Sequence, residues 1–195
     1  MDKKLYLVAG LGNPGRQYRN TRHNAGFILI DFMVDEFKVR LNKMQFNAIT
    51  GTVDTDDVRI ILAKPQTFMN LSGQSVAGLI RFFKIPLNQV LIVHDDIDLP
   101  MGTIRIRPGG GAGGQKGLES TIERLGTQDF PRMRIGIGRP SGTQDAAGYV
   151  LQEFSNRDIQ ILQEVFPQAV QAVRTFVRDG LETAMNRFNG VVGQE

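Results

Sequence analysis

Two short apolar runs constrain the fold of this chain most strongly. Residues 4–9 read KLYLVA and end at Gly10, and residues 90–95 read VLIVHD and lead into further acidic residues. Short apolar runs that are bounded by turn residues are typical of strands buried on both faces. Such strands occur mainly in parallel sheets that are covered by helices. The two runs therefore predict the interior of an α/β sheet.

The rest of the chain alternates between helical and strand patterns. Helical spacing of apolar residues predicts helices over 25–38, 69–84 and 118–125, and a long helical stretch over 155–188 around Pro167. Apolar or alternating runs predict strands over 45–53, 58–63, 102–107 and 132–138. No repeat and no Pro- or Ser-rich linker divides the sequence. We therefore predict one α/β domain over residues 1–195 with a mixed, mostly parallel sheet.

Composition excludes several classes of protein. Hydrophobic residues make up 41% of the 195 residues and charged residues 22%, as in an ordinary soluble domain and unlike a disordered chain. No apolar run is long enough for a membrane span, and the N-terminal residues predict no signal peptide. The absence of cysteine excludes disulfides, zinc–thiolate sites and thiol nucleophiles, and it fits a cytoplasmic protein. The net charge of +3 permits a nucleic-acid partner.

A glycine-rich loop follows the first apolar run. Residues 10–15, GLGNPG, match the G-x-G-x-x-G pattern of dinucleotide-binding loops. That pattern needs a helix that begins inside the motif, whereas Pro14 and the polar residues 16–22 delay the helical pattern by about ten residues. We therefore favour a side-chain-bearing loop over a nucleotide site. His23 ends this loop, at the edge of the sheet where open α/β folds place their sites.

Acidic residues follow the second apolar run in the segment His94-Asp95-Asp96-Ile97-Asp98. Two interpretations stay open: an aspartate orients a histidine that acts as a general base, or Asp95, Asp96 and Asp98 hold a magnesium ion. The sequence contains no P-loop, H-E-x-x-H or G-x-S-x-G motif. With no cysteine and no serine elbow, water activated by a histidine is the most economical chemistry.

Arginines and glycines form a third cluster. Arg105 and Arg107 precede the loop PGGGAGGQK, and this combination is typical of an anion or phosphate site, although a solvated edge strand would show the same arginine spacing. Arg132 and Arg134 repeat the i, i+2 spacing in another predicted strand. If the two strands pair, the four arginines form a basic patch.

Five motifs in order along the chain together resemble bacterial peptidyl-tRNA hydrolase, and the match runs from about residue 5 to 188. They are GLGNPG-x-x-Y-x-x-TRHNAGF, TFMNLSG-x-SVA, HDDIDLP-x-G, GGGAGGQKGLES and RIGIGRP. The resemblance implies hydrolysis of the ester between a peptide and the 3′ ribose of tRNA, without a cofactor or metal. It also implies one α/β globule with a twisted mixed sheet surrounded by helices, and a cytoplasmic monomer with no membrane and no obligate protein partner.

The resemblance also implies roles for individual residues. His23 matches the catalytic base and Asp95 its partner. The matches at the substrate are Asn13 and Asn70, which hold the peptide main chain, and Tyr18, Phe68 and Met69, which shape the channel. Arg105, Arg107 and Arg134 match basic residues that face the tRNA phosphates.

The sequence departs from the family pattern in the glycine loop. Lys116 stands where the family usually has Asn, and Gln115 stands where it often has His. Lysine offers three donors and no acceptor, so we expect Lys116 to contact a carbonyl or phosphate of the substrate. Relatives of the same fold act in chloroplast RNA splicing, so an RNA-binding protein without turnover is the alternative function. The presence of both His23 and Asp95 favours the enzyme.

Overall fold

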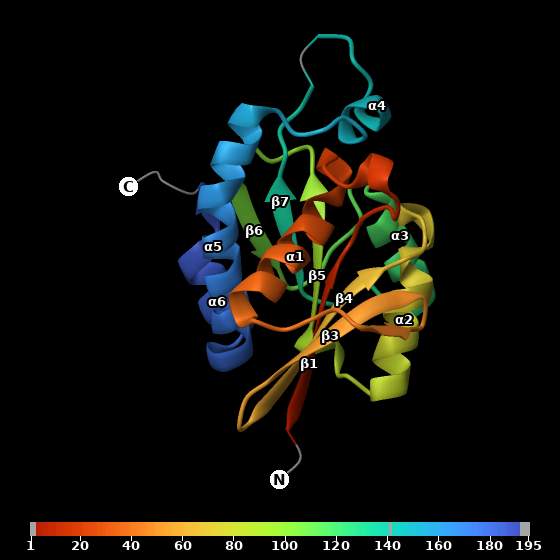
Figure 1. Cartoon of the computed structure of the whole chain (residues 1–195), viewed down its shortest axis with the longest axis vertical. Helices are drawn as coiled ribbons and strands as arrows, with labels where there is room; N and C mark the ends of the chain where they lie inside the picture. Colours follow the sequence, from red (N-terminus) through yellow and green to blue (C-terminus); the bar gives the residue numbers. More distant parts are fainter. Residues whose placement is uncertain (1–2, 141, 192–195) are drawn as a thin grey trace.

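The computed structural model describes residues 3–140 and 142–191, which form one mixed sheet with helices on both faces (Figure 1). The strands are β1 (Lys4–Gly10), β2 (Lys43–Gln45), β3 (Ala48–Asp54), β4 (Val58–Pro65), β5 (Val90–Asp96), β6 (Thr103–Arg107), β7 (Arg132–Gly136) and β8 (Gly190–Val191). The α-helices are α1 (Ala25–Phe37), α2 (Ser72–Phe83), α3 (Lys116–Leu125), α4 (Ala146–Val150), α5 (Asn156–Asp179) and α6 (Leu181–Phe188). Short 3₁₀ helices are η1 (Arg16–Tyr18), η2 (Arg22–Asn24), η3 (Met69–Leu71) and η4 (Leu87–Gln89).

The sheet has the order β2-β3-β4-β1-β5-β7-β6-β8. Its four central strands, β4, β1, β5 and β7, run parallel, whereas the pairs toward both edges are antiparallel. The predicted α/β class and mixed sheet are therefore confirmed, with the parallel strands confined to the centre. Since β1 and β5 are parallel neighbours, their carboxyl ends lie together, and Gly10 pairs with Val93.

Two apolar layers enclose the sheet. Helices α1, α5 and α6 cover one face, and α2 and α3 cover the other (Figure 1). Adjacent residues of β1 show the alternation: Val8 packs into the α1/α5 layer and Leu7 into the α2/α3 layer, and both are fully buried. This double burial explains why β1 is apolar at consecutive positions.

The N-terminus of α1 packs directly on the end of β1. A Cβ atom added to Gly10 would lie 2.2 Å from the carbonyl oxygen of Gly26, so a side chain at Gly10 would push the helix away. No helix begins within the GLGNPG motif. The first helical turn, η1, starts after it at Arg16, and η2 follows before α1 begins at Ala25. The close approach of α1 brings η2, and with it His23, to the carboxyl ends of β1 and β5.

Some predicted boundaries were wrong. The strand predicted over 45–53 is a hairpin of β2 and β3, since Phe46 and Asn47 both adopt positive φ, 50° and 56°, as a two-residue hairpin turn requires. The helical stretch over 155–188 is divided at Gly180, where φ is 92°, whereas Pro167 lies inside α5. Helix α4 and strand β8 were not predicted. Within residues 3–140 and 142–191, no helix is both long and apolar enough to cross a membrane.

Candidate active site

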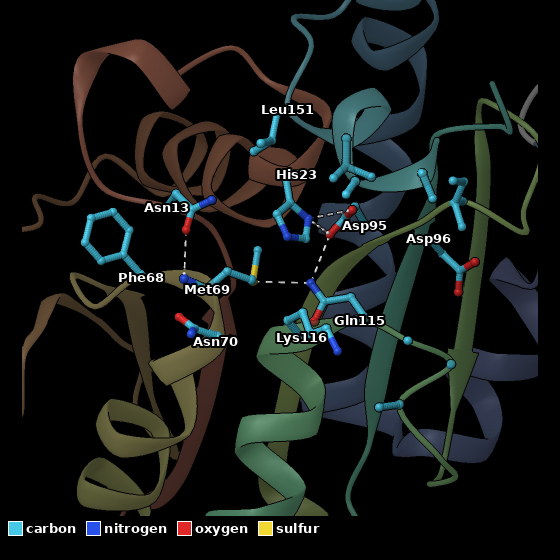
Figure 2. A pocket seen from close by; sticks show the side chains of 17 residues that line it. Asn13, His23, Phe68, Met69, Asn70, Asp95, Asp96, Gln115, Lys116 and Leu151 are labelled. Carbon is cyan, nitrogen blue, oxygen red and sulfur yellow. Dashed lines mark hydrogen bonds and ion pairs between the residues drawn. The ribbon is translucent and has the colours of Figure 1, made fainter. Parts of the chain in front are cut away.

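A cavity of about 710 Å³ opens beside the carboxyl ends of β1 and β5 (Figure 2). This volume lies within the range of small-molecule sites in proteins. Its polar lining comes from separate parts of the chain: Asn13, His23, Asn70, Asp95, Asp96, Gln115 and Lys116. Its apolar lining comes mainly from Phe68 and Met69 at the start of η3 and from α4 with the residue after it. The predicted residues are thus brought to one place, with Tyr18 and the arginines as exceptions.

His23 and Asp95 form the central contact of this cavity. Nδ1 of His23 lies 3.0 Å from Oδ1 and 2.9 Å from Oδ2 of Asp95. The side chain of His23 is 12% exposed and that of Asp95 is 4% exposed, so little water competes for the contact. A carboxylate accepts hydrogen bonds, and the Nδ1–H of the imidazole therefore donates. The other ring nitrogen, Nε2, then carries a lone pair.

Asn24 connects the loop that carries His23 to the first glycine cluster. Its Oδ1 accepts from the backbone N–H of Asn13 at 2.8 Å, and its Nδ2 donates to the carbonyl oxygen of Asn13 at 2.9 Å. Asn24 is buried, and these bonds satisfy both ends of its amide. We did not identify Asn24 from the sequence, although its position directly after His23 in a polar loop was a usable signal.

Asn13 presents a hydrogen-bond donor to the cavity. Its Oδ1 accepts from the backbone N–H of Met69 at 2.7 Å. Because this bond determines which end of the amide is the oxygen, Nδ2 is the end left for other partners. Figure 2 shows this nitrogen on the side of Asn13 that faces His23.

Gln115 reaches Asp95 from the second glycine loop. Its Nε2 donates to Oδ1 of Asp95 at 3.0 Å and lies 3.3 Å from Sδ of Met69. A chain of contacts therefore runs from Asn13 through Met69 and Gln115 to Asp95 and His23 (Figure 2). The sequence marks Gln115 only as a departure from a family pattern. A contact between side chains 20 residues apart left no local signal in the sequence.

The mouth of the cavity combines apolar and exposed polar groups. Phe68 is 56% exposed, and Asn70 beside it is also exposed. Helix α2 has Leu71 at its N-cap with no side-chain hydrogen bond there, so Asn70 does not cap this helix. Lys116 is the first residue of α3, and its Nζ lies 3.0 Å from Oε2 of Glu119.

Helix α4 supplies an apolar wall that the sequence did not reveal. Ala146, Ala147, Val150 and Leu151 line the cavity opposite η3. Arg22 connects this region to the His23 loop, because its guanidinium donates to the carbonyl of Glu153 at 2.9 Å and to Asp158 at 3.0 Å. The same guanidinium lies 4.4 Å from the ring centre of Tyr149. One side chain adjacent to His23 thus holds three points of the α4–α5 segment.

The chain is similar to one family of known proteins along almost its whole length. The family model described as peptidyl-tRNA hydrolase matches residues 7–195. This chain belongs to the peptidyl-tRNA hydrolase family. It is 44% identical to the peptidyl-tRNA hydrolase of Desulfitobacterium hafniense over 95% of this chain and 100% of that protein. It is 46% identical to the chloroplastic peptidyl-tRNA hydrolase of Arabidopsis thaliana over 94% of this chain, but it spans only 64% of that protein.

Solved structures give the same result for the fold. The crystal structure of peptidyl-tRNA hydrolase from Acinetobacter baumannii superposes with a TM-score of 0.90 at 34% identity, over 98% of each chain. The resemblance of the five motifs to this family is therefore confirmed, and so is the expectation of an ester hydrolase acting on peptidyl-tRNA.

Tyr18 is the one predicted channel residue outside the described lining of the cavity. It is the last residue of η1, half-buried, and it is absent from the described lining of the cavity. Its carbonyl oxygen accepts from Oγ1 of Thr21 at 2.8 Å. In this structure Tyr18 therefore contributes to the turn that precedes η2, and the prediction that it shapes the channel is not supported.

Pairing of the arginine-bearing strands is confirmed. Strands β6 and β7 are antiparallel neighbours, with Arg105 opposite Arg134 and Arg107 opposite Arg132. A second cavity, of about 460 Å³, lies beneath the glycine loop and is lined by three of these arginines, Arg107, Arg132 and Arg134. It shares Asp96, Ala112 and Gly113 with the first cavity, so the two adjoin.

The four arginines differ in their surroundings. Arg107 is exposed, whereas Arg134 has its Nε 2.5 Å from Oδ2 of Asp96. Arg132 is only 2% exposed, and it donates to backbone carbonyls of the glycine loop, at 2.5 Å to Gly110. Burial lowers the pKa of Arg132 to about 10, so its charge persists at neutral pH. Of the four arginines predicted to form a basic patch, Arg132 is therefore buried beneath the surface.

The three carboxylates considered for magnesium have different partners. Asp95 accepts from His23, Asp96 pairs with Arg134, and Asp98 pairs with Arg139. In the part of the chain that the structure describes, no group of three or more His, Cys, Asp or Glu side chains converges as a metal site. The geometry therefore favours the interpretation of Asp95 as the partner of a histidine.

Proposed function

We propose that this family member cleaves peptidyl-tRNA by activating water with His23. The supporting observation is the contact of His23 Nδ1 with both oxygens of Asp95, because it leaves Nε2 as the proton acceptor. Nε2 takes the proton of a water molecule as that water attacks the ester carbonyl. Asp95 then stabilises the imidazolium that forms. General-base help of this kind contributes about 10²–10⁴-fold to a rate.

The ester needs little further activation, so the mechanism uses neither a cofactor nor a covalent nucleophile. The tetrahedral intermediate carries a negative oxygen, which a preorganised donor stabilises. Asn13 Nδ2 is suited to this role, since its own Oδ1 is occupied by Met69 N–H. When the intermediate collapses, its bond to the ribose 3′ oxygen breaks and that oxygen takes the proton from the His23 imidazolium, which releases the peptide acid and free tRNA and restores neutral His23.

The peptide enters between η3 and α4. Phe68 and Met69 on one side and Val150 and Leu151 on the other offer apolar contacts that tolerate many side chains. Asn70 and Lys116 at the mouth supply donors for main-chain carbonyls. Recognition of the main chain suits a substrate whose peptide sequence varies.

Arginines near the second cavity bind the tRNA phosphates. Arg107 is exposed beside the glycine loop, and Arg105 and Arg134 lie opposite each other on β6 and β7. Because the two cavities adjoin, phosphates held there bring the 3′ end of the tRNA to the ester-cleaving site. We also propose that the protein acts as a cytoplasmic monomer, as one domain over residues 1–195; light scattering after size-exclusion chromatography tests the monomer.

An RNA-binding protein without turnover is the second candidate. The arginine-lined cavity alone would serve such a function. The two candidates differ only in whether the His23–Asp95 pair acts, so a measurement of product separates them.

The test is incubation of the protein with an N-acetylaminoacyl-tRNA, with uncharged tRNA as the binding control. The enzyme releases the N-acetylamino acid over many turnovers, and a chelator leaves the rate unchanged where the tRNA stays folded. Tight binding of both RNAs without release of product would favour the non-catalytic candidate.

A further inference from the structure

The side chain of Gln115 uses the two ends of its amide for different partners. Its Oε1 accepts from the backbone N–H of Leu118 at 2.7 Å and so caps the N-terminus of α3. Its Nε2 donates to Oδ1 of Asp95 at 3.0 Å (Figure 2). One residue therefore connects a helix terminus to the carboxylate that contacts His23.

The cap determines the orientation of this amide. Only the oxygen end can accept from Leu118 N–H, so the nitrogen end must face Asp95. The backbone restricts the residue as well, because Gln115 N–H donates to the carbonyl of Ala112 at 3.0 Å. Both contacts therefore hold Gln115 Nε2 in place as a donor to Asp95.

Other groups around Asp95 do not duplicate this contact. His23 approaches from η2. Asp96, next along β5, has its carboxylate on Arg134, and Lys116 of α3 has its ammonium on Glu119. From α4, the residues lining the cavity are apolar. Among the described residues, His23 and Gln115 are the two side chains that donate to Asp95.

We propose that Gln115 is a positioning residue for Asp95, holding its carboxylate against His23 through a hydrogen bond that does not titrate. The proposal rests on the proposed function only for its effect on rate. Gln115 acts through Asp95 and has no described contact with His23 itself. A primary amide keeps its donor at every pH, so the orientation of Asp95 stays the same across the working range of the enzyme.

Gln115→Glu separates the two roles of the side chain. The glutamate keeps an acceptor for Leu118 N–H, and a negative charge is favourable at a helix N-terminus. It replaces the donor toward Asp95 by a second carboxylate. Gln115→Met has a similar length and lacks both donor and acceptor. Gln74→Glu is the matched control. Gln74 is exposed on α2, so this substitution adds the same charge away from the cavity.

We expect Gln115→Glu to lower kcat roughly ten- to a hundredfold, the value of one hydrogen bond to a charged group, with a smaller change in KM. The acidic arm of its pH–rate profile moves to higher pH, because the added carboxylate favours the imidazolium of His23. Its Tm stays near that of the wild type. Gln115→Met lowers kcat and also lowers Tm by roughly 2–4 °C through loss of the cap. Gln74→Glu changes none of these values.

NMR titration of the histidine rings tests the proposal independently of turnover, since the chain has 2 histidines. We expect the titration of His23 to move to higher pH in Gln115→Glu and to stay unchanged in Gln74→Glu. Coincident His23 titrations in wild type and Gln115→Glu would overturn the proposal, whether or not the protein turns over. A wild type without turnover would instead count against the proposed function.

Discussion

Asp95 meets Nδ1 of His23 with both of its carboxylate oxygens, at 3.0 and 2.9 Å, although the two residues are 72 positions apart. They meet because β1 and β5 are parallel neighbours. Asp95 lies within the carboxyl end of β5, and His23 lies in the loop that leaves β1. The contact orients the imidazole and determines which ring nitrogen is free to accept a proton from water.

Asp95→Asn tests the contribution of the carboxylate. We expect kcat to fall roughly ten- to a hundredfold, because an amide oxygen still accepts from Nδ1–H but carries no charge to stabilise the imidazolium. The loss is smaller than that in His23→Ala, since Asp95 does not take the proton. Steady-state kinetics of both variants on the same substrate checks this order. A greater loss in Asp95→Asn would contradict the assigned roles.

Arg107 and Arg134 should differ in their contribution to tRNA binding. Each phosphate contact contributes roughly 0.7–0.9 to the slope of log K against log salt. We expect Arg107→Gln to reduce the slope by about this amount, because Arg107 is exposed, and Arg134→Gln to reduce it less, because Arg134 is paired with Asp96. Filter binding over a series of salt concentrations measures both slopes.

Arg178→Gln serves as the control for this comparison. Arg178 is exposed near the C-terminal end of α5 and pairs with Asp179. Its replacement should leave the slope unchanged. Equal slopes for wild type and Arg107→Gln would show that Arg107 lies on a solvated strand and makes no phosphate contact.

Local patterns in the sequence predicted the elements that carry the site. The apolar runs around Leu7 and Leu91 identified β1 and β5, because burial on both faces leaves a continuous apolar signature. The β2–β3 hairpin was missed because Phe46 and Asn47 are not the usual glycine-containing pair of such a turn. The helical stretch predicted around Pro167 does continue through that residue, but it ends as α5 before Gly180, whose positive φ the apolar spacing did not reveal.

Non-local contacts explain what the sequence could not predict at the site. Arg132 and Arg134 share a strand face, but only the packing of the glycine loop over Arg132 buries it. The contact from Gln115 to Asp95 and the apolar wall of α4 depend on how separate segments pack. The sequence identified His23 and Asp95 as candidate site residues through a family resemblance. Only the fold shows that the two side chains lie within hydrogen-bonding distance.

His94 should make the stability of the protein depend on pH. It is fully buried, and burial lowers its pKa below the ordinary value of 6.5. At a pH between the lowered pKa of folded His94 and the ordinary value, the unfolded chain binds more protons than the folded one. The free energy of unfolding therefore falls as the pH falls below about 6.5. The loss is at most about 1.4 kcal/mol per pH unit from this group.

Urea unfolding of wild type and His94→Gln at roughly pH 7 and roughly pH 5.5 measures this effect. The difference in free energy between the two pH values should be smaller in the variant, because glutamine does not titrate. An identical pH dependence in both proteins would show that His94 protonates equally in the folded and unfolded states.

The most direct test of the account is a parallel measurement of turnover and tRNA binding in His23→Ala. If His23 activates the water, the rate of ester cleavage falls by about 10²–10⁴-fold. The Kd for uncharged tRNA stays within about threefold of the wild-type value. His23 lines the first cavity, where the ester is cleaved, and is outside the described lining of the second, arginine-lined cavity. Turnover close to that of the wild type in His23→Ala would contradict the assignment of His23 as the base.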